Sequence, residues 1–256
     1  MNQIITLLSD WRLRDPYVSM LKGRILQSLP DAQIIDITHY VDKFNIMQTA
    51  LLMKTGYSSF PKGSIHLIMT NMSLDSTFSP VLLCHDGHYF IGEDNGVFHL
   101  MFGQSYPIKG MQLTDNQENT LNHIISLIKA IKEGTLEQKT KEYVSFKRMF
   151  VEQPDYSAGD QQIEGHILYI DAFNNAITDI PVRMFTETVQ GKPFTATILS
   201  KGTWTITKFF TYYNVSEEEM FLCSNSLGLI EVAAYQSDVA VLADLEPGDK
   251  VIIKID

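Results

Sequence analysis

The sequence predicts two domains of different fold class: an α/β domain over residues 1–134, with a mainly parallel sheet and flanking helices, and an all-β, barrel-like domain over residues 164–256. In the first, short apolar runs alternate with segments of helical periodicity, the pattern of a sheet connected by crossover helices. In the second, short runs rich in β-branched and aromatic residues follow one another between turn signals, the pattern of a small barrel or sandwich. The polar segment 135–163 contains Pro154 and Gly159 and is predicted to connect the two domains.

The elements predicted for the first domain are, in order, a strand at 4–8, a helix at 18–26, a strand at 32–37, a helix at 45–57, a strand at 64–69, a hairpin of 81–84 with 88–91, and a helix at 119–132. The first run is continuously apolar, as in strands buried on both faces, and it ends just before Ser9 and Asp10. Asp86-Gly87 is a hairpin signal. Asn119 is a suitable N-cap for the last helix, which Gly134 is expected to end.

The second domain is predicted to contain strands and no helix. The expected strands are 166–170, 194–199, 203–211, 219–223, 229–235 and 250–255. Turn residues separate these runs, and the segments between them give no convincing helical pattern.

Composition and charge exclude several classes of protein. The chain has 256 residues and a formal net charge of −10, and neither domain is net basic: residues 164–256 hold 13 acidic and 6 basic side chains. Nucleic acid is therefore not expected as the main partner, because phosphate backbones select basic surfaces. We find neither a signal-peptide pattern nor a run of about 18 apolar residues, so we expect a soluble, cytoplasmic protein without a membrane partner. Cys84 and Cys223 are expected to be buried free thiols.

Common catalytic and cofactor motifs are missing from the sequence. It has no phosphate-binding loop, no dinucleotide glycine fingerprint and no Gly-x-Ser-x-Gly elbow. His85 and His88 are three residues apart, but they flank a predicted turn and lack a third ligand. We therefore expect a solvated turn there and no metal site.

Two polar segments lie where a ligand could bind. Asp10 follows the first strand, and open α/β sheets bind ligands beyond the carboxyl ends of their strands. A carboxylate at that place can accept two hydrogen bonds from a ribose diol, although the spacing alone favours a helix N-cap or an ion pair with Arg12 or Arg14.

The second polar segment is 170–178, at the start of the second domain. Phe173 can stack on a flat ring there, while Asp171 and Asn175 offer polar groups to its edges. An Asn-rich β-turn without a ligand explains the same residues.

Six blocks in this order resemble the sequence of a known family. They are Thr6–Asp10 with Arg14–Val18 and Lys22-Gly23, then Asp36–His39, Phe60–His66, Gly87–Gly96, Ile170–Asn175 and Asn225–Ala233. On these blocks the chain is identified as a member of the S-adenosylmethionine hydroxide adenosyltransferases, which are related to fluorinating and chlorinating enzymes that use the same substrate. The resemblance implies an α/β domain, a C-terminal β-barrel and a homotrimer. S-adenosylmethionine would bind between the N-terminal domain of one subunit and the C-terminal domain of its neighbour.

The resemblance also implies roles for individual residues. Asp10 would hold the ribose diol, Phe44 would take the place of an aromatic wall residue, and Asp15 would belong to the same substrate-binding set. In the second domain the methionine and adenine ends would be held by Asp171, Phe173, Asn175 and Ser226. No cofactor is implied, because S-adenosylmethionine itself is the substrate or ligand.

The catalytic positions of the family differ in this sequence. In the family reaction a water-derived hydroxide attacks the 5′ carbon of the ribose and displaces methionine, and the family uses an Asp, an Arg seven residues later, and a His for this. Here Asn71 stands at the Asp position and Phe78 at the Arg position, and Asn122 stands at the His position unless a gap places His123 there. Asn cannot act as a base near neutral pH, so Asp75 and His123 are candidate substitutes.

Three hypotheses remain open from the sequence. The first is an enzyme that converts S-adenosylmethionine and water into adenosine and methionine, with an altered triad. The second is a catalytically inactive protein that binds S-adenosylmethionine or adenosine. The third is halide transfer, with which Ser73, Ser76 and Thr77 are compatible, although Leu227 stands where halogenating relatives carry an Arg.

Overall fold

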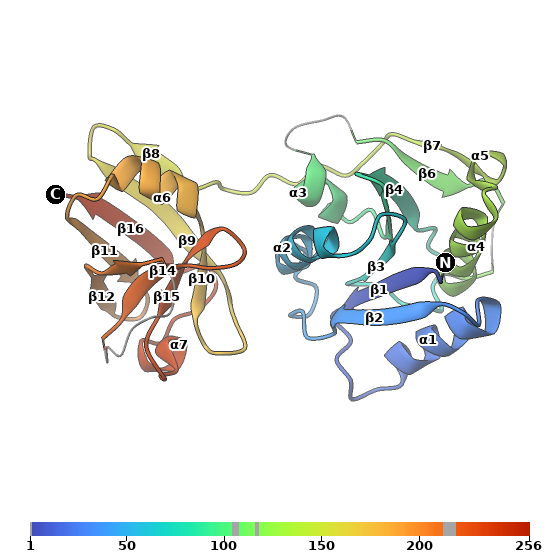
Figure 1. Cartoon of the computed structure of the whole chain (residues 1–256), viewed down its shortest axis with the longest axis horizontal. Helices are drawn as coiled ribbons and strands as arrows, with labels where there is room; N and C mark the ends of the chain where they lie inside the picture. Colours follow the sequence, from blue (N-terminus) through green and yellow to red (C-terminus); the bar gives the residue numbers. More distant parts are fainter. Residues whose placement is uncertain (1, 104–107, 116–117, 212–218) are drawn as a thin grey trace. The chain divides into compact units, whose positions relative to one another are not determined.

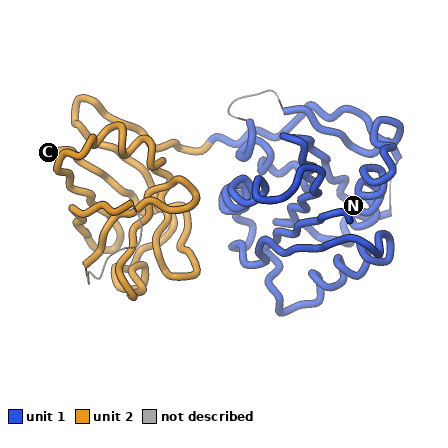
Figure 2. Tube along the Cα trace, viewed as in Figure 1, with its two compact units in different colours: residues 1–150 blue, residues 151–256 orange. Residues whose placement is uncertain are grey.

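A computed structural model describes residues 2–103, 108–115, 118–211 and 219–256. The chain forms two compact units, residues 1–150 and 151–256 (Figure 2). The boundary falls inside the polar segment 135–163. This segment contributes α5 (Leu136–Lys139) and β7 (Thr140–Tyr143) to the first unit, and β8 (Asp155–Ser157) to the second. Among the described residues, no helix has both the length and the apolar character needed to cross a bilayer.

The first unit is built on a seven-stranded sheet with the order β2-β1-β3-β5-β4-β6-β7 (Figure 1). Its elements in chain order are β1 (Ile4–Ser9), α1 (Tyr17–Ser28), β2 (Gln33–Thr38), α2 (Ile46–Gly56), the 3-10 turn η1 (Tyr57–Ser59), β3 (Ile65–Met69), β4 (Val81–His85), β5 (His88–Gly92), α3 (Val97–Phe102), β6 (Gly110–Leu113) and α4 (Thr120–Glu133), followed by α5 and β7. Strands β2, β1, β3 and β5 pair in parallel, and β4, β6 and β7 extend the sheet with antiparallel pairs.

Side chains of the parallel strands alternate between the two faces of the sheet, and a separate hydrophobic core buries each face. On one face Leu7 belongs to a core that includes α1 and α4 residues, among them Leu21 and Ile124. On the other face Leu8 belongs to a core that includes α2 and α3 residues. A sheet covered by helices on both faces is the α/β arrangement that the alternating runs predict, and it places the carboxyl ends of β1, β2 and β3 at one edge.

The local signals in this unit are confirmed. Asn119 accepts a hydrogen bond from the backbone N–H of Asn122 at 2.9 Å and caps α4, which ends at Gly134 with a φ of 68°. Asp86-Gly87 turns β4 into β5, so that His85 and His88 face each other in the register. The helix α3 and the strand β6 are elements that the sequence analysis did not predict.

Two expectations about single residues in this hairpin are wrong. His88 is 3% exposed rather than solvated, because it points inward from β5. There its Nδ1 lies 3.0 Å from Nε2 of His66, whose Nδ1 lies 2.7 Å from the hydroxyl of Thr6. Burial, followed by the proximity of His88, lowers the pKa of His66 to about 3. Cys84, expected to be buried, is exposed on β4.

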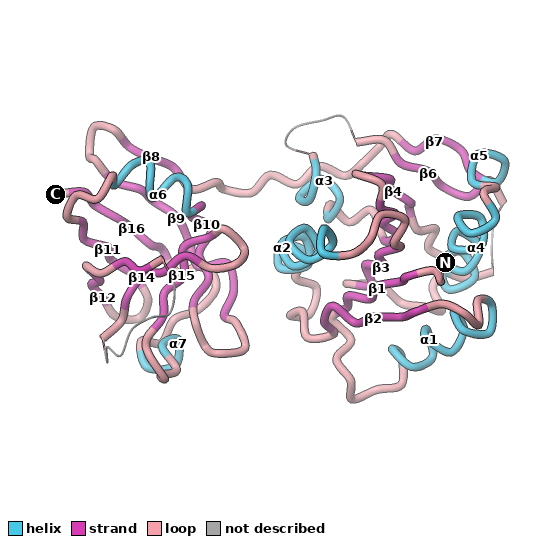
Figure 3. Tube along the Cα trace, viewed as in Figure 1, coloured by secondary structure: helices cyan, strands magenta, loops and turns pink. Residues whose placement is uncertain are grey.

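The second unit is a curled, strand-rich sheet that forms a half-barrel, with the strand order β12-β11-β16-β9-β10-β15-β14-β13 and β8 beside β9 (Figure 3). Its elements after β8 are β9 (Gln162–Ile170), β10 (Ala176–Pro181), α6 (Val182–Val189), β11 (Phe194–Leu199), β12 (Thr203–Ile206), β13 (Phe209–Phe210), β14 (Phe221–Ser224), β15 (Leu229–Ala233), α7 (Val239–Leu242) and β16 (Lys250–Ile255). The barrel-like fold class is confirmed, and its core lies within the curl of the sheet.

The expectation that this unit has no helix is wrong. Helix α6 follows Pro181 directly and buries Phe185 and Val189, which are four residues apart and therefore share one helical face. Helix α7 is a single short turn. The predicted strand 203–211 is divided into β12 and β13, and β10 was missed because an Asn-rich turn precedes it.

Candidate functional site

Asp10 joins three segments at the carboxyl edge of the first sheet. It follows β1 directly and is 8% exposed. Its Oδ2 atom accepts hydrogen bonds from the backbone N–H groups of Phe44, at 2.9 Å, and Asn71, at 3.2 Å. Both donors have left-handed backbones, with φ values of 64° and 58°, which non-glycine residues seldom adopt without support. The carboxylate therefore fixes the segments after β2 and β3 around the end of β1.

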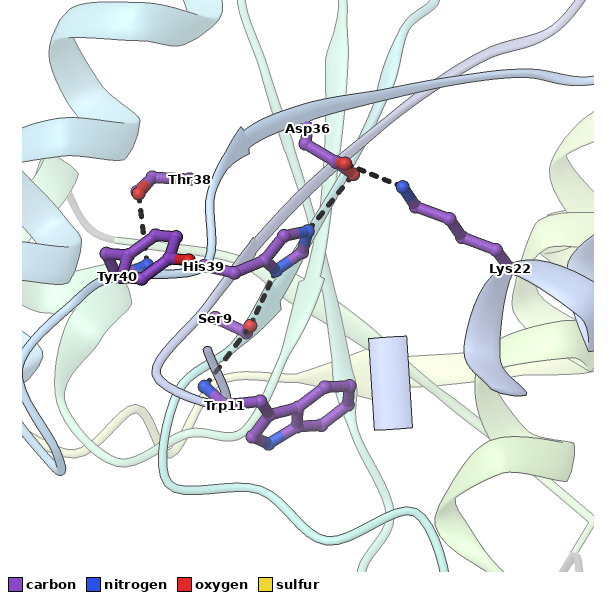
Figure 4. A network of polar contacts seen from close by, with 7 residues as sticks. All are labelled: Ser9, Trp11, Lys22, Asp36, Thr38, His39 and Tyr40. Carbon is purple, nitrogen blue, oxygen red and sulfur yellow. Dashed lines mark hydrogen bonds and ion pairs between the residues drawn. The ribbon is translucent and has the colours of Figure 1, made fainter. Parts of the chain in front are cut away.

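A chain of polar contacts holds the backbone on either side of that carboxylate (Figure 4). The hydroxyl of Ser9 lies 2.7 Å from Nδ1 of His39 and accepts a hydrogen bond from the backbone N–H of Trp11 at 3.4 Å. Nε2 of His39 lies 3.1 Å from Asp36, which also accepts a hydrogen bond of 2.6 Å from Lys22. Because Ser9 and His39 are buried, this network positions the loop and does not present a nucleophile to solvent.

The same network changes the pKa of the Asp36 carboxyl group. Burial acts to raise its pKa, but the hydrogen bonds from Lys22 and His39 and their charges outweigh burial and lower the pKa below its usual value. Asp36 is therefore ionised at neutral pH. It contacts both Lys22 and His39, and His39 in turn contacts Ser9.

Large apolar side chains are exposed on the same segments. Phe44 is 69% exposed, and Leu13, Tyr17 and Tyr40 are also exposed, with the guanidinium of Arg12 5.7 Å from the centre of the Tyr40 ring. Exposed apolar groups of this size, gathered on neighbouring loops, mark surfaces that bind a ligand or another chain. Asp15 is exposed in the loop before α1.

The four predicted catalytic residues lie on two segments. Asn71 follows β3, and its backbone N–H donates a hydrogen bond to Asp10. Asp75 is exposed further along the same loop. The side chain of Asn122, in the first turn of α4, accepts a hydrogen bond of 3.3 Å from Arg24 on α1.

His123 is buried beside Asn122 on α4. Its Nε2 lies 3.4 Å from the hydroxyl of Ser79, and burial lowers the pKa of this imidazole. Several hydrogen bonds from Trp11, Gln112 and the start of α4 hold the loop that leads to Ser79. The indole N–H of Trp11 donates to the carbonyl of Met72 at 3.0 Å, and the hydroxyl of Thr120 donates to the carbonyl of Phe78 at 2.8 Å. The Phe78 side chain packs against the core instead of offering a charge.

The second unit contains a pocket of about 760 Å³. The residues that line it are Asp171, Ala172, Phe173, Asn175, Ser224, Asn225, Ser226, Glu231, Ala234, Tyr235, Gln236, Ser237 and Asp238. The four binding residues predicted in this half of the chain are all among them. The structure thus brings together residues that are more than fifty positions apart in the sequence.

Asp171 shapes the turn that carries the aromatic ring into this pocket. Its Oδ1 atom accepts hydrogen bonds from the backbone N–H groups of Phe173 at 2.8 Å and Asn175 at 2.9 Å, and Asn174 between them has a φ of 58°. Phe173 is left 77% exposed, whereas Asn175 is buried. The turn expected from the Asn-rich sequence therefore also forms one wall of the pocket.

Glu231 is a pocket residue that the sequence analysis did not select. It lies on β15, is 4% exposed and lines the pocket with Asp171. Burial, together with the negative charge of Asp171, raises the pKa of Glu231 to about 7. In the sequence, the feature that could have indicated Glu231 is that it is the single acidic residue within the apolar run Leu229–Ala233. Among the described residues, no three His, Cys, Asp or Glu side chains form a group that could hold a metal ion.

The fold and these two sites define a class of protein: an α/β unit with a buried carboxylate at the end of its first strand, and a half-barrel unit with an acidic, aromatic-walled pocket. Comparison with known families gives the particular family. Residues 5–129 match the SAM hydroxide adenosyltransferase N-terminal domain, and residues 165–252 match the C-terminal domain of the same family. The chain therefore belongs to the SAM hydroxide adenosyltransferase family, where SAM is S-adenosylmethionine.

Individual relatives agree with this family. The chain is 25% identical to a protein of Methanocaldococcus jannaschii named (R)-S-adenosyl-L-methionine hydrolase, over 98% of this chain and 95% of that protein. Among solved structures, it is similar to an uncharacterized conserved protein from Thermotoga maritima, with a TM-score of 0.82, 20% identity and coverage of 98% of this chain and 100% of that one. A conserved hypothetical protein from Thermus thermophilus gives a TM-score of 0.69 at 21% identity, with coverage of 99% and 100%. These two likenesses support the fold.

Proposed function

We propose that the protein binds SAM and hydrolyses it to adenosine and methionine, at a rate reduced by the altered triad. The observation that carries the proposal is the pocket of the second unit, in which Asp171, Phe173, Asn175 and Ser226 meet around a space large enough for a nucleoside. Membership of the family and the hydrolase relative, which spans nearly the whole chain, support it.

The proposed reaction is a displacement at the 5′ carbon of the ribose. A water oxygen forms a bond to that carbon while the carbon–sulfur bond breaks, and its electron pair stays on sulfur, so that methionine leaves as a neutral thioether. The water proton passes to solvent or to a nearby base. Asp10 would accept hydrogen bonds from the ribose diol, which orients the 5′ carbon because the loops around Asp10 are fixed.

The altered triad determines the expected rate. Asn71 can orient a water molecule through its amide, but it cannot take up the proton. The loss of a positioned base costs about 10²- to 10⁴-fold in rate when the rest of a site is retained. Because Phe78 packs into the core and His123 is buried beside Ser79, neither supplies an obvious replacement charge in the structure.

The same three residues favour the alternative, a protein that binds SAM or adenosine without turning it over. The two functions are separated by incubation with SAM followed by chromatography. Adenosine above the no-protein control supports the enzyme. Binding in a calorimeter without adenosine release supports the binding protein.

We further propose that the protein acts as a homotrimer and that each ligand is held by groups from two subunits. The exposed Phe44, Leu13 and Tyr40 side chains are consistent with a surface that another chain covers. Sedimentation of the full chain tests the assembly. Mixing Asp10→Ala with Asp171→Ala subunits and allowing them to exchange tests the shared site: about a quarter of the sites should then regain both residues, whereas sites within single chains would regain none.

A further inference from the structure

The pocket of the second unit has an unbalanced charge. Three of its lining residues are acidic, Asp171, Glu231 and Asp238, and none of the described residues that line it is Lys, Arg or His. Asp171 accepts hydrogen bonds from the backbone of its own turn, and Asp238 accepts one from the side chain of Asn174, so both carboxyl groups have a structural role. A pocket for a neutral nucleoside gives no comparable reason to bury the carboxyl group of Glu231.

Glu231 differs from the other two in its burial and in its place on the sheet. In the register it lies opposite Ile177 on β10 and Cys223 on β14, and Ile177 in turn lies opposite Tyr169 on β9. The strand neighbours Ile230 and Val232 belong to the core within the curl, so Glu231 points from the other face of the sheet, where it lines the pocket. Because an apolar side chain would be buried in this row at a lower desolvation cost, the carboxyl group of Glu231 points to a role in binding.

Within the part of the chain that the structure describes, the groups that line the pocket around Glu231 do not include a cation. From β9 and the turn after it come Tyr169 and Asp171, from β14 comes Cys223, and the segment after β15 adds Tyr235 and Asp238 to the pocket. Burial and the charges of Asp171 and Glu231 raise the pKa of Tyr169 to about 12, and burial with Asp171 raises the pKa of Cys223 to about 12. Both therefore remain uncharged near neutral pH, and the negative charge of the pocket is set by its carboxyl groups.

We propose that Glu231 makes this pocket selective for a positively charged adenosyl ligand, one with an ammonium or sulfonium group, over an uncharged nucleoside. When the cation enters, the carboxyl group of Glu231 releases its proton to the solvent and faces the ligand as a carboxylate. A neutral nucleoside leaves the carboxyl group protonated. The proposal rests on the proposed function, because it takes the pocket to be the place where the adenosyl ligand binds.

Titration calorimetry of the full chain tests this. SAM, S-adenosylhomocysteine and adenosine are titrated at pH 6 and pH 7 in two buffers with different ionisation enthalpies, which gives the number of protons released. The three probes carry an ammonium with a sulfonium, an ammonium alone, and no positive charge. With the pKa of Glu231 at about 7, SAM should release about half a proton at pH 7 and bind about fivefold more tightly at pH 7 than at pH 6. Adenosine should release none and bind equally at both pH values.

The variant Glu231→Gln removes the ionisation at nearly constant volume. We expect it to abolish the proton release and to weaken SAM binding at pH 7 about tenfold or more, with adenosine binding within twofold of wild type. Glu187→Gln makes the same change on the exposed face of α6 and should alter none of these values. Because the α-amino group of the ligand titrates near pH 8, any proton release that survives in Glu231→Gln belongs to the ligand.

The outcomes separate this inference from the proposed function. If none of the three probes binds the wild-type protein, the proposed function fails and this inference fails with it. If SAM and adenosine bind with the same affinity and the same proton release, the inference is overturned while the proposed function stands. Since that comparison uses the wild-type chain alone, it holds even if Glu231→Gln does not fold.

Discussion

Replacing Asp10 by Ala removes the acceptor that fixes two backbone segments at the carboxyl edge of the first sheet. The N–H groups of Phe44 and Asn71 then lose their partner, and both residues are free to leave their left-handed conformations. A buried donor left without an acceptor costs about 1–3 kcal/mol. Because these donors are partly buried, we expect a loss of about 2–4 kcal/mol in the free energy of unfolding, measured as the shift in the urea midpoint at constant slope.

The variant Asp10→Asn separates this structural role from ligand binding. It keeps an oxygen that can accept the two backbone hydrogen bonds, so most of the stability should remain. The charge that would accept the ribose hydroxyls is lost, and a hydrogen bond to a charged group contributes about 1.5–3 kcal/mol. Adenosine binding, measured by calorimetry, should therefore weaken about 10- to 150-fold. The matched change Asp31→Asn, on an exposed residue after α1, should have no effect. An Asp10→Asn protein that binds adenosine like the wild type would refute this reasoning.

Three further predictions follow from other contacts. The pKa of His66 in the fold, about 3, lies below the unfolded value of about 6.5, so the stability that the neutral ring contributes is complete above pH 6.5 and is lost as the pH falls toward 3. The free energy of unfolding, obtained from urea titrations, should drop by up to about 1.4 kcal/mol per pH unit in this range, and by less in His66→Gln. Asn71→Asp restores a carboxylate at the position of the family's base, and adenosine formation should rise at least tenfold in a chromatographic assay; an unchanged rate would mean that the missing base is not what limits turnover. Asp36→Asn removes the charge that Lys22 and His39 contact, and it should weaken adenosine binding by a few-fold with a urea midpoint close to that of the wild type, whereas Asp31→Asn leaves both values unchanged.

Local signals in the sequence were sufficient for β1 to β5 and for α1, α2 and α4 of the first unit, because these elements are regular. The continuous apolar run of β1 and the cap at Asn119 act within a few residues, and both appear in the structure as expected. The antiparallel strand β4 was predicted as half of a hairpin, but β6 and β7 were missed, since strands of only four residues carry little periodicity.

Tertiary contacts explain what the sequence analysis missed in the second unit. Helix α6 is eight residues long, and its apolar Phe185 and Val189 resemble residues of a strand until the curled sheet that buries them is known. His88 shows the same limit in the first unit, because its partner His66 lies on another strand.

The residues of the candidate site also fall into two groups: those that the sequence could indicate, and those whose significance depends on tertiary contacts. Asp10 and Asp171 follow strands and could be selected from their positions and the family blocks, and both prove to hold backbone N–H groups. Glu231 could not be selected, because its significance depends on Asp171, sixty residues earlier, lining the same pocket. The side-chain partners of Asn122 and His123 likewise come from α1 and from the loop before β4, which no spacing in the sequence indicates.

The most direct test of SAM hydrolysis is to incubate the purified chain with SAM and to quantify both products by chromatography. We predict that adenosine and methionine appear in equal amounts above the no-protein control, and that Asp10→Asn and Asp171→Asn each reduce them at least tenfold. If neither product exceeds the control at any protein concentration, the protein does not hydrolyse SAM and the proposed reaction is wrong.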